Sequence, residues 1–230
     1  MSLRLVCSVV VWMGLLSLAL LGRGRAAAQV QSNPSGNPSV HHGPKAAPGA
    51  DLPDAGSVSG GVYRNSSFGF SCKIPAGWVL RTEEMNQRPE GGSKADSGRV
   101  LLAAFARPPM ARGEDVNSSI LIAAESASSY PGLKEAGQYL GPVTEIAEAQ
   151  GFETVNPPYE IALGAKTMAR ADFQKDVASR VMRQSTLVIL ARGFALSFTF
   201  IGGTEDEVGE LIDGLNFSGG AKAGGTPQKK

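Results

Sequence analysis

Apolar residues occupy every second position of the segment FGFSCKI, residues 68–74, with Gly, Ser and Lys between them. This period is typical of a β-strand that buries one face. The next unit, IPAG at 74–77, fits a type I turn, because proline fixes φ at the second position and glycine follows at the fourth. We therefore predict that the chain reverses here, and that Trp78 starts a second strand, which pairs with the first and belongs to the core.

Two further segments, 99–108 and 118–126, are dense in apolar and β-branched residues. Continuous apolar runs of this length are typical of strands covered on both faces, so we predict that both are central in a sheet. Residues 157–174 predict two more strands, which flank Gly164.

Residues 178–203 contain the clearest hairpin pattern in the chain. Arg192 and Gly193 form a two-residue connection between two apolar segments, as in tight hairpins. The second strand of this hairpin is predicted to carry one apolar face, formed by Phe194, Leu196, Phe198 and Phe200.

Residues 131–150 carry apolar residues three and four positions apart, which is the spacing of an amphipathic helix, and Gly151 follows as a C-terminal cap. Pro142 lies inside this pattern, directly after Gly141. Because proline removes a backbone donor and crowds the preceding turn, we predict a kink or two short helices at this point.

A last amphipathic helix is predicted before residue 217. Thr204 and Glu207 have the spacing of a capping box, and apolar residues follow at helical intervals, so this helix is expected to lie on the sheet. Glu205, Asp206 and Glu207 form an acidic cluster. Because negative charge in the first turn complements the helix dipole, we interpret the cluster as structural.

The first 28 residues have the pattern of a secretory signal peptide: Arg4, an apolar run over 5–21, and three alanines before residue 29. Cleavage after Ala28 would make the protein periplasmic or secreted and would leave no membrane span. The alternative is an uncleaved anchor, because a 17-residue run reaches the lower limit for crossing a bilayer. Basic residues that follow the run also favour retention.

Composition divides the rest of the chain into three parts. Residues 29–60 are rich in Pro, Gly, Ser and Ala and lack aromatic residues, so we predict a disordered linker. Residues 218–230 have the same character and are predicted to form a disordered tail. Residues 61–217 are long enough for one globular domain, and their mixture of strands and helices predicts an α/β fold.

Charge gives no indication of a nucleic-acid partner. The chain has 22 basic and 21 acidic residues, and three of the basic residues lie in the first 28, which hold no acidic residue. The remainder therefore carries 19 basic against 21 acidic residues, a formal charge of −2. This balance favours neither nucleic acid nor an anionic membrane surface as a partner.

Side chains for catalysis or metal binding are sparse. His41 and His42 both lie in the predicted linker, so the domain cannot supply a Ser-His pair, a Cys-His pair or a histidine metal cluster. Cys72, the lone cysteine after the signal, is expected to be buried and unreactive.

Arg170 and Asp172 share one strand face and could form a polar patch for a partner or for catalysis, although cross-strand surface pairs are the preferred interpretation. No phosphate-binding, dinucleotide-binding or nucleophile-elbow motif is present. We predict no catalytic residue, no metal and no cofactor.

The order of elements resembles the PsbP-like superfamily, which comprises the extrinsic photosystem II protein, exported bacterial relatives and Ran-binding eukaryotic relatives. The similar segments are YRNSSFGFSCKIPAGW, the two central strands, a helix, the hairpin VILARGFALSFTFIGG and the closing helix ending LIDGLNF, within residues 61–217. The resemblance implies an α/β/α sandwich around a mainly antiparallel sheet, in a domain that acts as an accessory or binding protein. It identifies no ligand residue in this chain.

Two hypotheses for the function follow. The first is an exported, non-catalytic accessory domain, monomeric, that binds an unknown protein or envelope component while the linker supplies reach. The second is a histidine-independent exported hydrolase that uses carboxylates brought together by the fold. A deep pocket holding two or more acids with raised pKa values would favour the second. The missing catalytic patterns favour the first.

Overall fold

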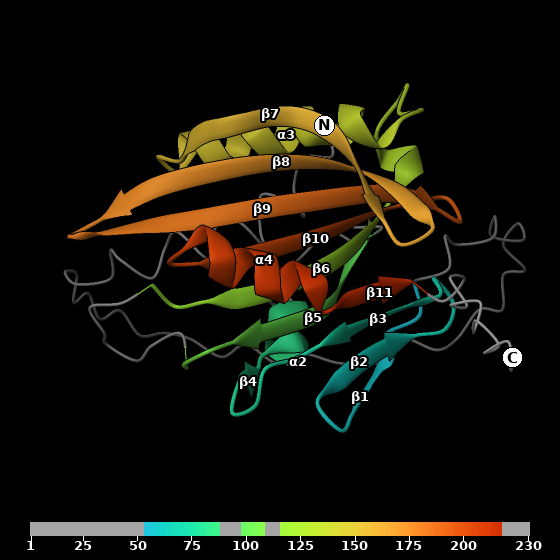
Figure 1. Ribbon diagram of the computed structural model, residues 1–230. Helices are drawn as coiled ribbons and strands as arrows, with labels where there is room; N and C mark the ends of the chain where they lie inside the picture. The colour runs from blue at the N-terminus through green and yellow to red at the C-terminus, as the bar shows by residue number, and fades with distance from the viewer. Residues whose placement is uncertain (1–52, 88–97, 109–115, 218–230) are drawn as a thin grey trace, which may run out of the picture.

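The structure of the protein, a computed structural model, describes residues 53–87, 98–108 and 116–217. These residues form three layers around a large antiparallel sheet (Figure 1). One helix, α3, covers one face, and the opposite face is covered by a second, smaller sheet together with helix α4. The predicted α/β/α sandwich is therefore confirmed, with a second sheet that the sequence did not indicate.

The large sheet has seven strands in the order β4-β5-β6-β10-β9-β8-β7, and every neighbouring pair is antiparallel. Its strands are β4 (Val79–Leu80), β5 (Gly98–Phe105), β6 (Ser119–Ser126), β7 (Glu153–Leu163), β8 (Lys166–Val177), β9 (Arg180–Ala191) and β10 (Phe194–Gly202).

The small sheet has the order β1-β2-β3-β11 and is also antiparallel. Its strands are β1 (Ser57–Ser59), β2 (Val62–Asn65), β3 (Phe70–Lys73) and β11 (Leu215–Phe217). The helices of the described residues are α2 (Thr82–Asn86), the 3-10 turn η2 (Ala127–Ser129), α3 (Ala136–Ala149) and α4 (Glu205–Asp213).

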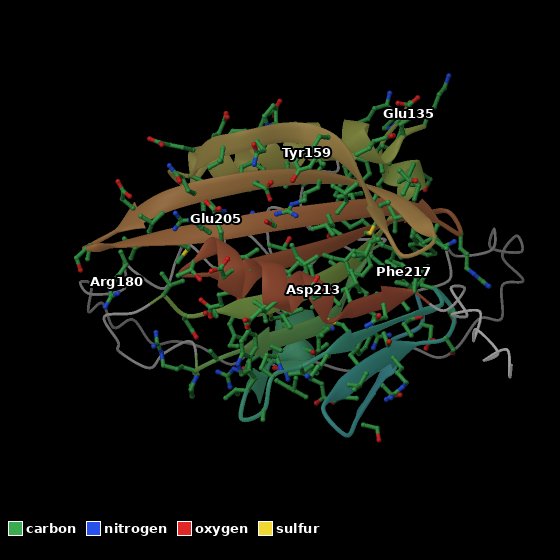
Figure 2. All side chains as sticks on the ribbon, in the orientation of Figure 1. Glu135, Tyr159, Arg180, Glu205, Asp213 and Phe217 are labelled. Carbon is green, nitrogen blue, oxygen red and sulfur yellow. The ribbon has the colours of Figure 1, made fainter. Side chains whose placement is uncertain are left out.

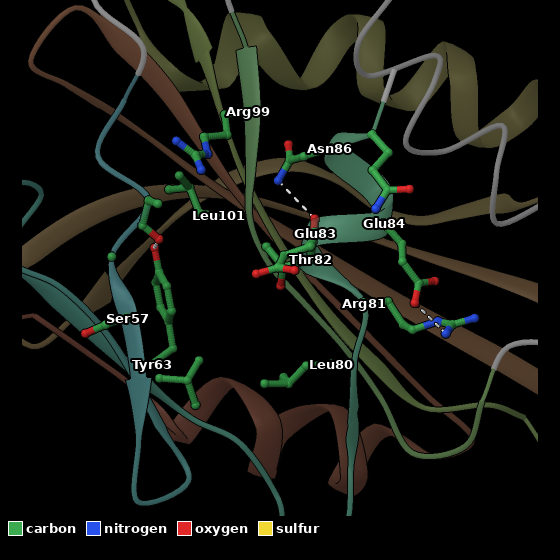
Figure 3. Close-up of a pocket in the computed structure, with 14 residues that line it drawn as sticks. Ser57, Tyr63, Leu80, Arg81, Thr82, Glu83, Glu84, Asn86, Arg99 and Leu101 are labelled. Carbon is green, nitrogen blue, oxygen red and sulfur yellow. Dashed lines mark hydrogen bonds and ion pairs between the residues drawn. The ribbon is translucent and has the colours of Figure 1, made fainter. Parts of the chain in front are cut away.

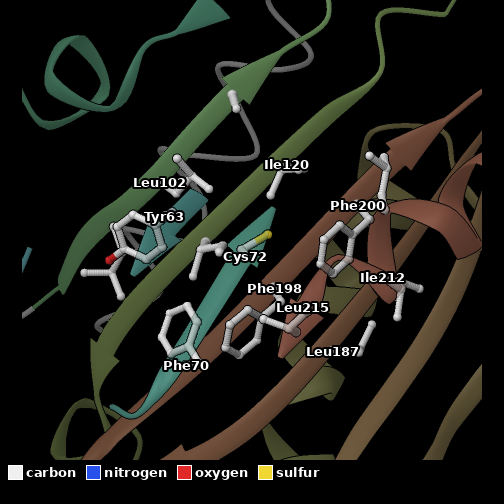
Figure 4. Packing of buried hydrophobic residues seen from close by; sticks show 14 of the residues in the cluster. Tyr63, Phe70, Cys72, Leu102, Ile120, Leu187, Phe198, Phe200, Ile212 and Leu215 are labelled. Carbon is white, nitrogen blue, oxygen red and sulfur yellow. The ribbon is translucent and has the colours of Figure 1, made fainter. Parts of the chain in front are cut away.

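The main core lies between the two sheets and under α4 (Figure 4). Aromatic rings connect the layers, since Phe70 of β3 meets Phe198 of β10 edge to face with 5.0 Å between ring centroids. Phe217 of β11 contacts both rings at 6.0 Å. A second cluster lies between α3 and the other face of β8, β9 and β10. The large sheet is thus apolar on both faces, as its central strands predict.

The hairpin predicted at Arg192-Gly193 is confirmed. Both residues have positive φ, 52° and 80°, which matches the right-handed twist of the strands that they join. The strands around Gly164 and the two central strands β5 and β6 are also confirmed, and every residue of β6 is buried.

The strand that follows Trp78 does not pair with the strand that precedes the turn. A turn does form, but it is shifted by one residue from the prediction. The Trp78 amide donates to the Pro75 carbonyl at 3.4 Å, so Ala76 and Gly77 are the central residues, and the φ of 82° at Gly77 is that of a type II turn, not the predicted type I. However, β3 pairs with β2 and β11, whereas β4 pairs with β5 of the large sheet. The chain therefore changes sheets at this turn. Trp78 is only partly buried and packs against the edge of the main core.

The folded region begins before residue 61. Strand β1 lies inside the segment that composition predicts as a linker, so the predicted boundary at residue 60 is wrong. Side chains at the end of β2 and just after it hold this segment in place. Asn65 Nδ2 donates to the Asp54 carbonyl at 2.8 Å, and the Asp54 carboxylate accepts from Ser67 Oγ at 3.0 Å. Such polar contacts need no apolar pattern, and composition therefore missed them. Residues 1–52 and 218–230 lie outside the described residues, as do the predicted signal and tail.

Helix α3 is continuous through Pro142, so of the two predicted alternatives the division into two short helices is wrong. It begins at Ala136, later than predicted, because Glu135 and Gln138 form a reciprocal capping box. One face of the helix is buried against the sheet, and this packing outweighs the single donor lost at Pro142. Gly151, at φ 83°, ends the helix as expected.

Helix α4 lies on the large sheet, as predicted, but the capping box at its start is only half formed. Thr204 Oγ1 accepts from the Glu207 amide at 3.1 Å, whereas the Glu207 carboxylate accepts from the Gly203 amide and from Ser118 Oγ instead. Through Ser118, the first turn of α4 is held against the start of β6. After α4 the chain adds β11, which pairs with β3 and closes the small sheet.

Cys72 is expected to react with a thiol reagent only after unfolding. Its side chain is 0% exposed, and burial raises the pKa of its thiol to about 12. The reactive form is the thiolate. The native thiol is therefore unreactive for two reasons: the reagent cannot reach it, and it stays protonated at neutral pH. The peptide that contains Cys72 should therefore be unmodified in mass spectra after native treatment with a maleimide, and modified after treatment in guanidinium. Rapid native labelling would mean a one-residue shift in strand register, which would reverse the side chains.

Candidate functional site

A cavity of about 780 Å³ opens between the β1–β2 strands on one side and the α2–β5 segment on the other (Figure 3). Figure 3 shows Tyr63 and Ser57 on one wall and the side chains of α2 on the opposite wall, with Arg99 of β5 between them. The lining residues are Ala55, Gly56, Ser57, Val58, Tyr63, Leu80, Arg81, Thr82, Glu83, Glu84, Asn86, Gln87, Arg99 and Leu101.

The first wall depends on a close approach of two backbone segments. The Tyr63 hydroxyl donates to the Ala55 carbonyl at 2.9 Å, which draws the segment before β1 onto the ring. Gly56 lies at φ 64°, and a Cβ at this position would be 2.5 Å from the Arg64 carbonyl oxygen. Only glycine fits there, so the shape of this wall is fixed by one residue type.

The second wall is formed where β4 ends and leaves the edge of β5 unpaired. Helix α2 satisfies that edge with side chains: Thr82 Oγ1 accepts from the Ala103 amide at 2.9 Å. Asn86 accepts from the Val100 amide at 3.0 Å and donates to the Val100 carbonyl at 2.8 Å. The helix therefore protects the strand edge and at the same time holds its own side chains over the cavity.

An irregularity in β5 shapes the floor of the cavity. The register with β6 shifts between Val100 and Leu102, so Leu101 has no paired residue. Leu101 and Leu102 both belong to the main core, whereas Val100 packs with Met85 of α2. A bulge of this kind places two consecutive side chains on one face, and Leu101 reaches the cavity as a result.

Of the four charged side chains that line the cavity, two pair with each other and two have no partner among the described residues. Arg81 and Glu84 form an ion pair at 2.6 Å. Among the described residues, neither Arg99 nor Glu83 makes a side-chain hydrogen bond or an ion pair. Burial raises the pKa of the Tyr63 hydroxyl, and the hydrogen bond from Asn65 and the charge of Arg99 act in the opposite direction.

A second polar cluster lies on the face of β7, β8 and β9 that extends beyond α4. Its centre is Asp172, a buried carboxylate that accepts four hydrogen bonds. Oδ1 accepts from Arg170 Nε at 2.8 Å and from Ser185 Oγ at 2.5 Å. Oδ2 accepts from Asn156 Nδ2 at 3.0 Å and from the Tyr159 hydroxyl at 2.8 Å. We call these five residues the Asp172 cluster.

The Asp172 cluster keeps its carboxylate ionised. Burial alone would raise the pKa of Asp172, but hydrogen bonds from Ser185, Arg170 and Tyr159 outweigh it, and the pKa is lowered. A carboxylate in this state is a poor general acid, because it holds no proton at neutral pH. Its role is to fix the side chains that donate to it.

The predicted cross-strand surface pairs of Arg170 and Asp172 are only half right. Asp172 does meet side chains across both neighbouring strands, but it is buried and not on the surface. The two residues also pair directly along the same strand. The alternation of side chains along a strand predicts that both lie on one face. The contributions of Asn156 and Tyr159 could not be predicted from spacing, because the pairing of β7 with β8 is irregular between these two residues.

The remaining candidates from the sequence contribute no site. Glu205 and Asp206 are exposed in the first turn of α4. His41 and His42 lie outside the described residues. No group of three or more His, Cys, Asp or Glu side chains within the described ranges could hold a metal ion. Sequence reasoning missed Arg99 and Tyr63, because nothing in their local pattern relates one to the other.

No helix in the described part of the chain is long and apolar enough to cross a membrane. The apolar run at 5–21 is not among those residues.

Comparison of the sequence with protein-family models and with curated proteins finds no match. Solved structures do match, at 13 to 18% identity. Cyanobacterial PsbP from Synechocystis sp. PCC 6803 is 18% identical with a TM-score of 0.41, over 70% of this chain and 98% of its own. The Ran-binding protein Mog1p of Saccharomyces cerevisiae is 13% identical with a TM-score of 0.37, over 65% of this chain and 90% of its own.

LpqN of Mycobacterium tuberculosis, described as involved in cell envelope biogenesis, is 17% identical with a TM-score of 0.34, over 63% of this chain and 76% of its own. The matched structures thus include a PsbP and a Ran-binding protein. The predicted PsbP-like resemblance is confirmed, as a resemblance of fold alone.

Proposed function

We propose that the protein is an exported, non-catalytic accessory domain that binds a protein partner of the cell envelope through the Asp172 cluster. The observation that carries this proposal is the pairing of Tyr159 and Arg170 on the open face of β7 and β8. Figure 2 shows Tyr159 on β7, the edge strand of the large sheet. Export is supported by the signal-like pattern of residues 1–28.

Tyrosine and arginine are the side chains that most often dominate the binding energy of protein interfaces. Tyr159 is 39% exposed, although its hydroxyl is engaged by Asp172. The Arg170 guanidinium lies 6.0 Å from the Tyr159 ring centroid and is held through Nε and Nη2 by Asp172 and Ser185. Both side chains are therefore fixed before binding, which reduces the entropy lost on association.

The chemistry of the cluster favours a partner that presents a carboxylate beside an apolar group. Arg170 has used Nε and Nη2, and Nη1 has no partner among the described residues. A carboxylate of the partner can accept from Nη1 while its apolar neighbour covers the tyrosine ring. Val155 lies on the same strand and is 49% exposed, but it is not part of the cluster.

The carboxylate hydrolase remains the alternative function. The cavity holds two acids, but Glu83 and Glu84 are consecutive residues of one short helix, and Glu84 is paired with Arg81. Residues that are adjacent along a helix do not face each other, so this pair does not have the flanking arrangement of a two-carboxylate mechanism.

The test is capture from an envelope extract by the exported chain, compared with Tyr159→Ala and the control Val155→Ala. We expect a specific partner to be retained by the wild type, strongly reduced with Tyr159→Ala, and nearly unchanged with Val155→Ala. The exported chain should also begin at or near Gln29.

Equal capture by both variants would place the interface elsewhere on the domain. A reproducible hydrolase activity that Glu83→Gln abolishes without unfolding the protein would overturn the proposal in favour of the enzyme.

A further inference from the structure

The cavity between β1–β2 and α2–β5 contains an arginine, Arg99, that has no partner among the described residues. Arg99 is half-buried in its wall, and no other described side chain supplies it with a hydrogen bond or an ion pair. The neighbouring Arg81 is different, because Glu84 already neutralises it. A guanidinium held in a concave site without a counter-ion is complementary to an anion, since its planar fork matches two acceptor oxygens.

The other charges of the cavity restrict what that anion can be. Two arginines and two glutamates line it, so the lining has no net charge. Glu83 also has no partner among the described side chains and would repel a second negative charge on the ligand. A monoanion such as a carboxylate therefore fits better than a phosphate dianion.

The walls of the cavity favour a ligand that also has an apolar part. Val58 and Leu80 are 42% and 44% exposed, and they are two of the few large apolar side chains that the described residues leave exposed. Both line this cavity, together with Leu101 and the ring of Tyr63. A volume of about 780 Å³ is within the range of small-molecule sites, which combine apolar walls with a few placed polar groups.

We propose that this cavity binds a small organic monocarboxylate, with Arg99 as the anchor of the carboxylate and Val58, Leu80 and Leu101 around its apolar body. This site is separate from the Asp172 cluster and does not depend on the proposed protein partner.

The test uses the purified, ¹⁵N-labelled chain titrated with hexanoate and followed by amide chemical shifts. Parallel titrations with hexylamine and with inorganic phosphate separate the carboxylate from its apolar body and from anions in general. We expect saturable shifts with hexanoate, confined to the residues that line the cavity, and no comparable saturation with the other two probes.

Arg99→Gln is expected to weaken hexanoate binding by roughly tenfold or more, because a charge-assisted hydrogen bond is lost. The matched control is Arg64→Gln, an exposed arginine of β2 outside the lining, which should leave the affinity unchanged. If Arg99→Gln does not fold, Glu83→Gln serves as a second variant. Removal of this exposed negative charge should tighten hexanoate binding by roughly two- to fivefold.

Three results would overturn the proposal. One is the absence of saturable shifts with hexanoate. Another is an affinity that neither Arg99→Gln nor Glu83→Gln changes. The third is phosphate binding as tight as that of hexanoate with the same dependence on Arg99, which would make the cavity a general anion site.

Discussion

Phe198→Ala is expected to lower the free energy of unfolding by about 3 to 5 kcal/mol, the usual cost of a buried Phe truncation. The side chain is 0% exposed and contacts the rings of Phe70 and Phe217, so its loss opens a cavity between the two sheets. Both partners belong to the small sheet, and they cannot follow the truncated side chain without moving their strands. Equilibrium unfolding in urea, followed by circular dichroism, measures the change.

Phe194→Ala is the matched control for this prediction. Phe194 lies on the same strand and the same face, but it is only partly buried and contacts one ring, that of Phe68. We expect a clearly smaller loss of stability. Equal losses for the two variants would show that the contact between the sheets contributes little to the stability of the fold.

Asp172→Asn is expected to destabilise the protein by about 2 to 4 kcal/mol at neutral pH, because four donors lose a charged acceptor in a buried site. The amide also brings an N–H group toward those donors. Asp176→Asn is the control, since Asp176 lies on the same strand and is exposed. Its effect should be within the error of the measurement.

The effect of Asp172→Asn is expected to depend on pH in one direction. The pKa of Asp172 is lower in the folded protein than the value of about 3.9 expected in the unfolded chain. The stabilisation is therefore fully present above that value and is lost as the pH falls through the folded pKa. The difference between wild type and variant should be constant near neutrality and should shrink in acid. A difference that grows in acid would contradict the lowered pKa.

Local patterns predicted most of the individual elements. The Arg192-Gly193 turn is an example, because positive φ at both positions and apolar alternation on either side are properties of neighbouring residues. The buried strands β5 and β6 were predictable for the same reason. The alternative of two short helices at Pro142 is wrong, because the packing of α3 against the sheet outweighs the local preference of proline.

Pairing between distant segments was beyond the local pattern. The alternation that ends at Ile74 shows that β3 buries one face, but it does not show which strands pair with it. The chain passes to the large sheet after Trp78 and returns only with β11, in which Leu215 pairs with Cys72 of β3. Strand edges carry the same backbone donors and acceptors whatever their sequence, so the choice of partner depends on the packing of the whole domain.

The sequence by itself determined the strand and helix segments, the faces that they bury, the missing histidine chemistry and the PsbP-like resemblance. Each depends on residue type or on spacing within one segment. Tertiary structure alone decided the cavity and the Asp172 cluster. Arg99 and Tyr63 line one cavity because β5 of the large sheet, with its bulge, lies next to the segment before β1 of the small sheet, which the Tyr63 hydroxyl holds at Ala55. Asp172 gathers its donors from three strands. A side chain's binding partners depend on distances across the fold, whereas its tendency to be buried depends on its own chemistry and its place in the local period.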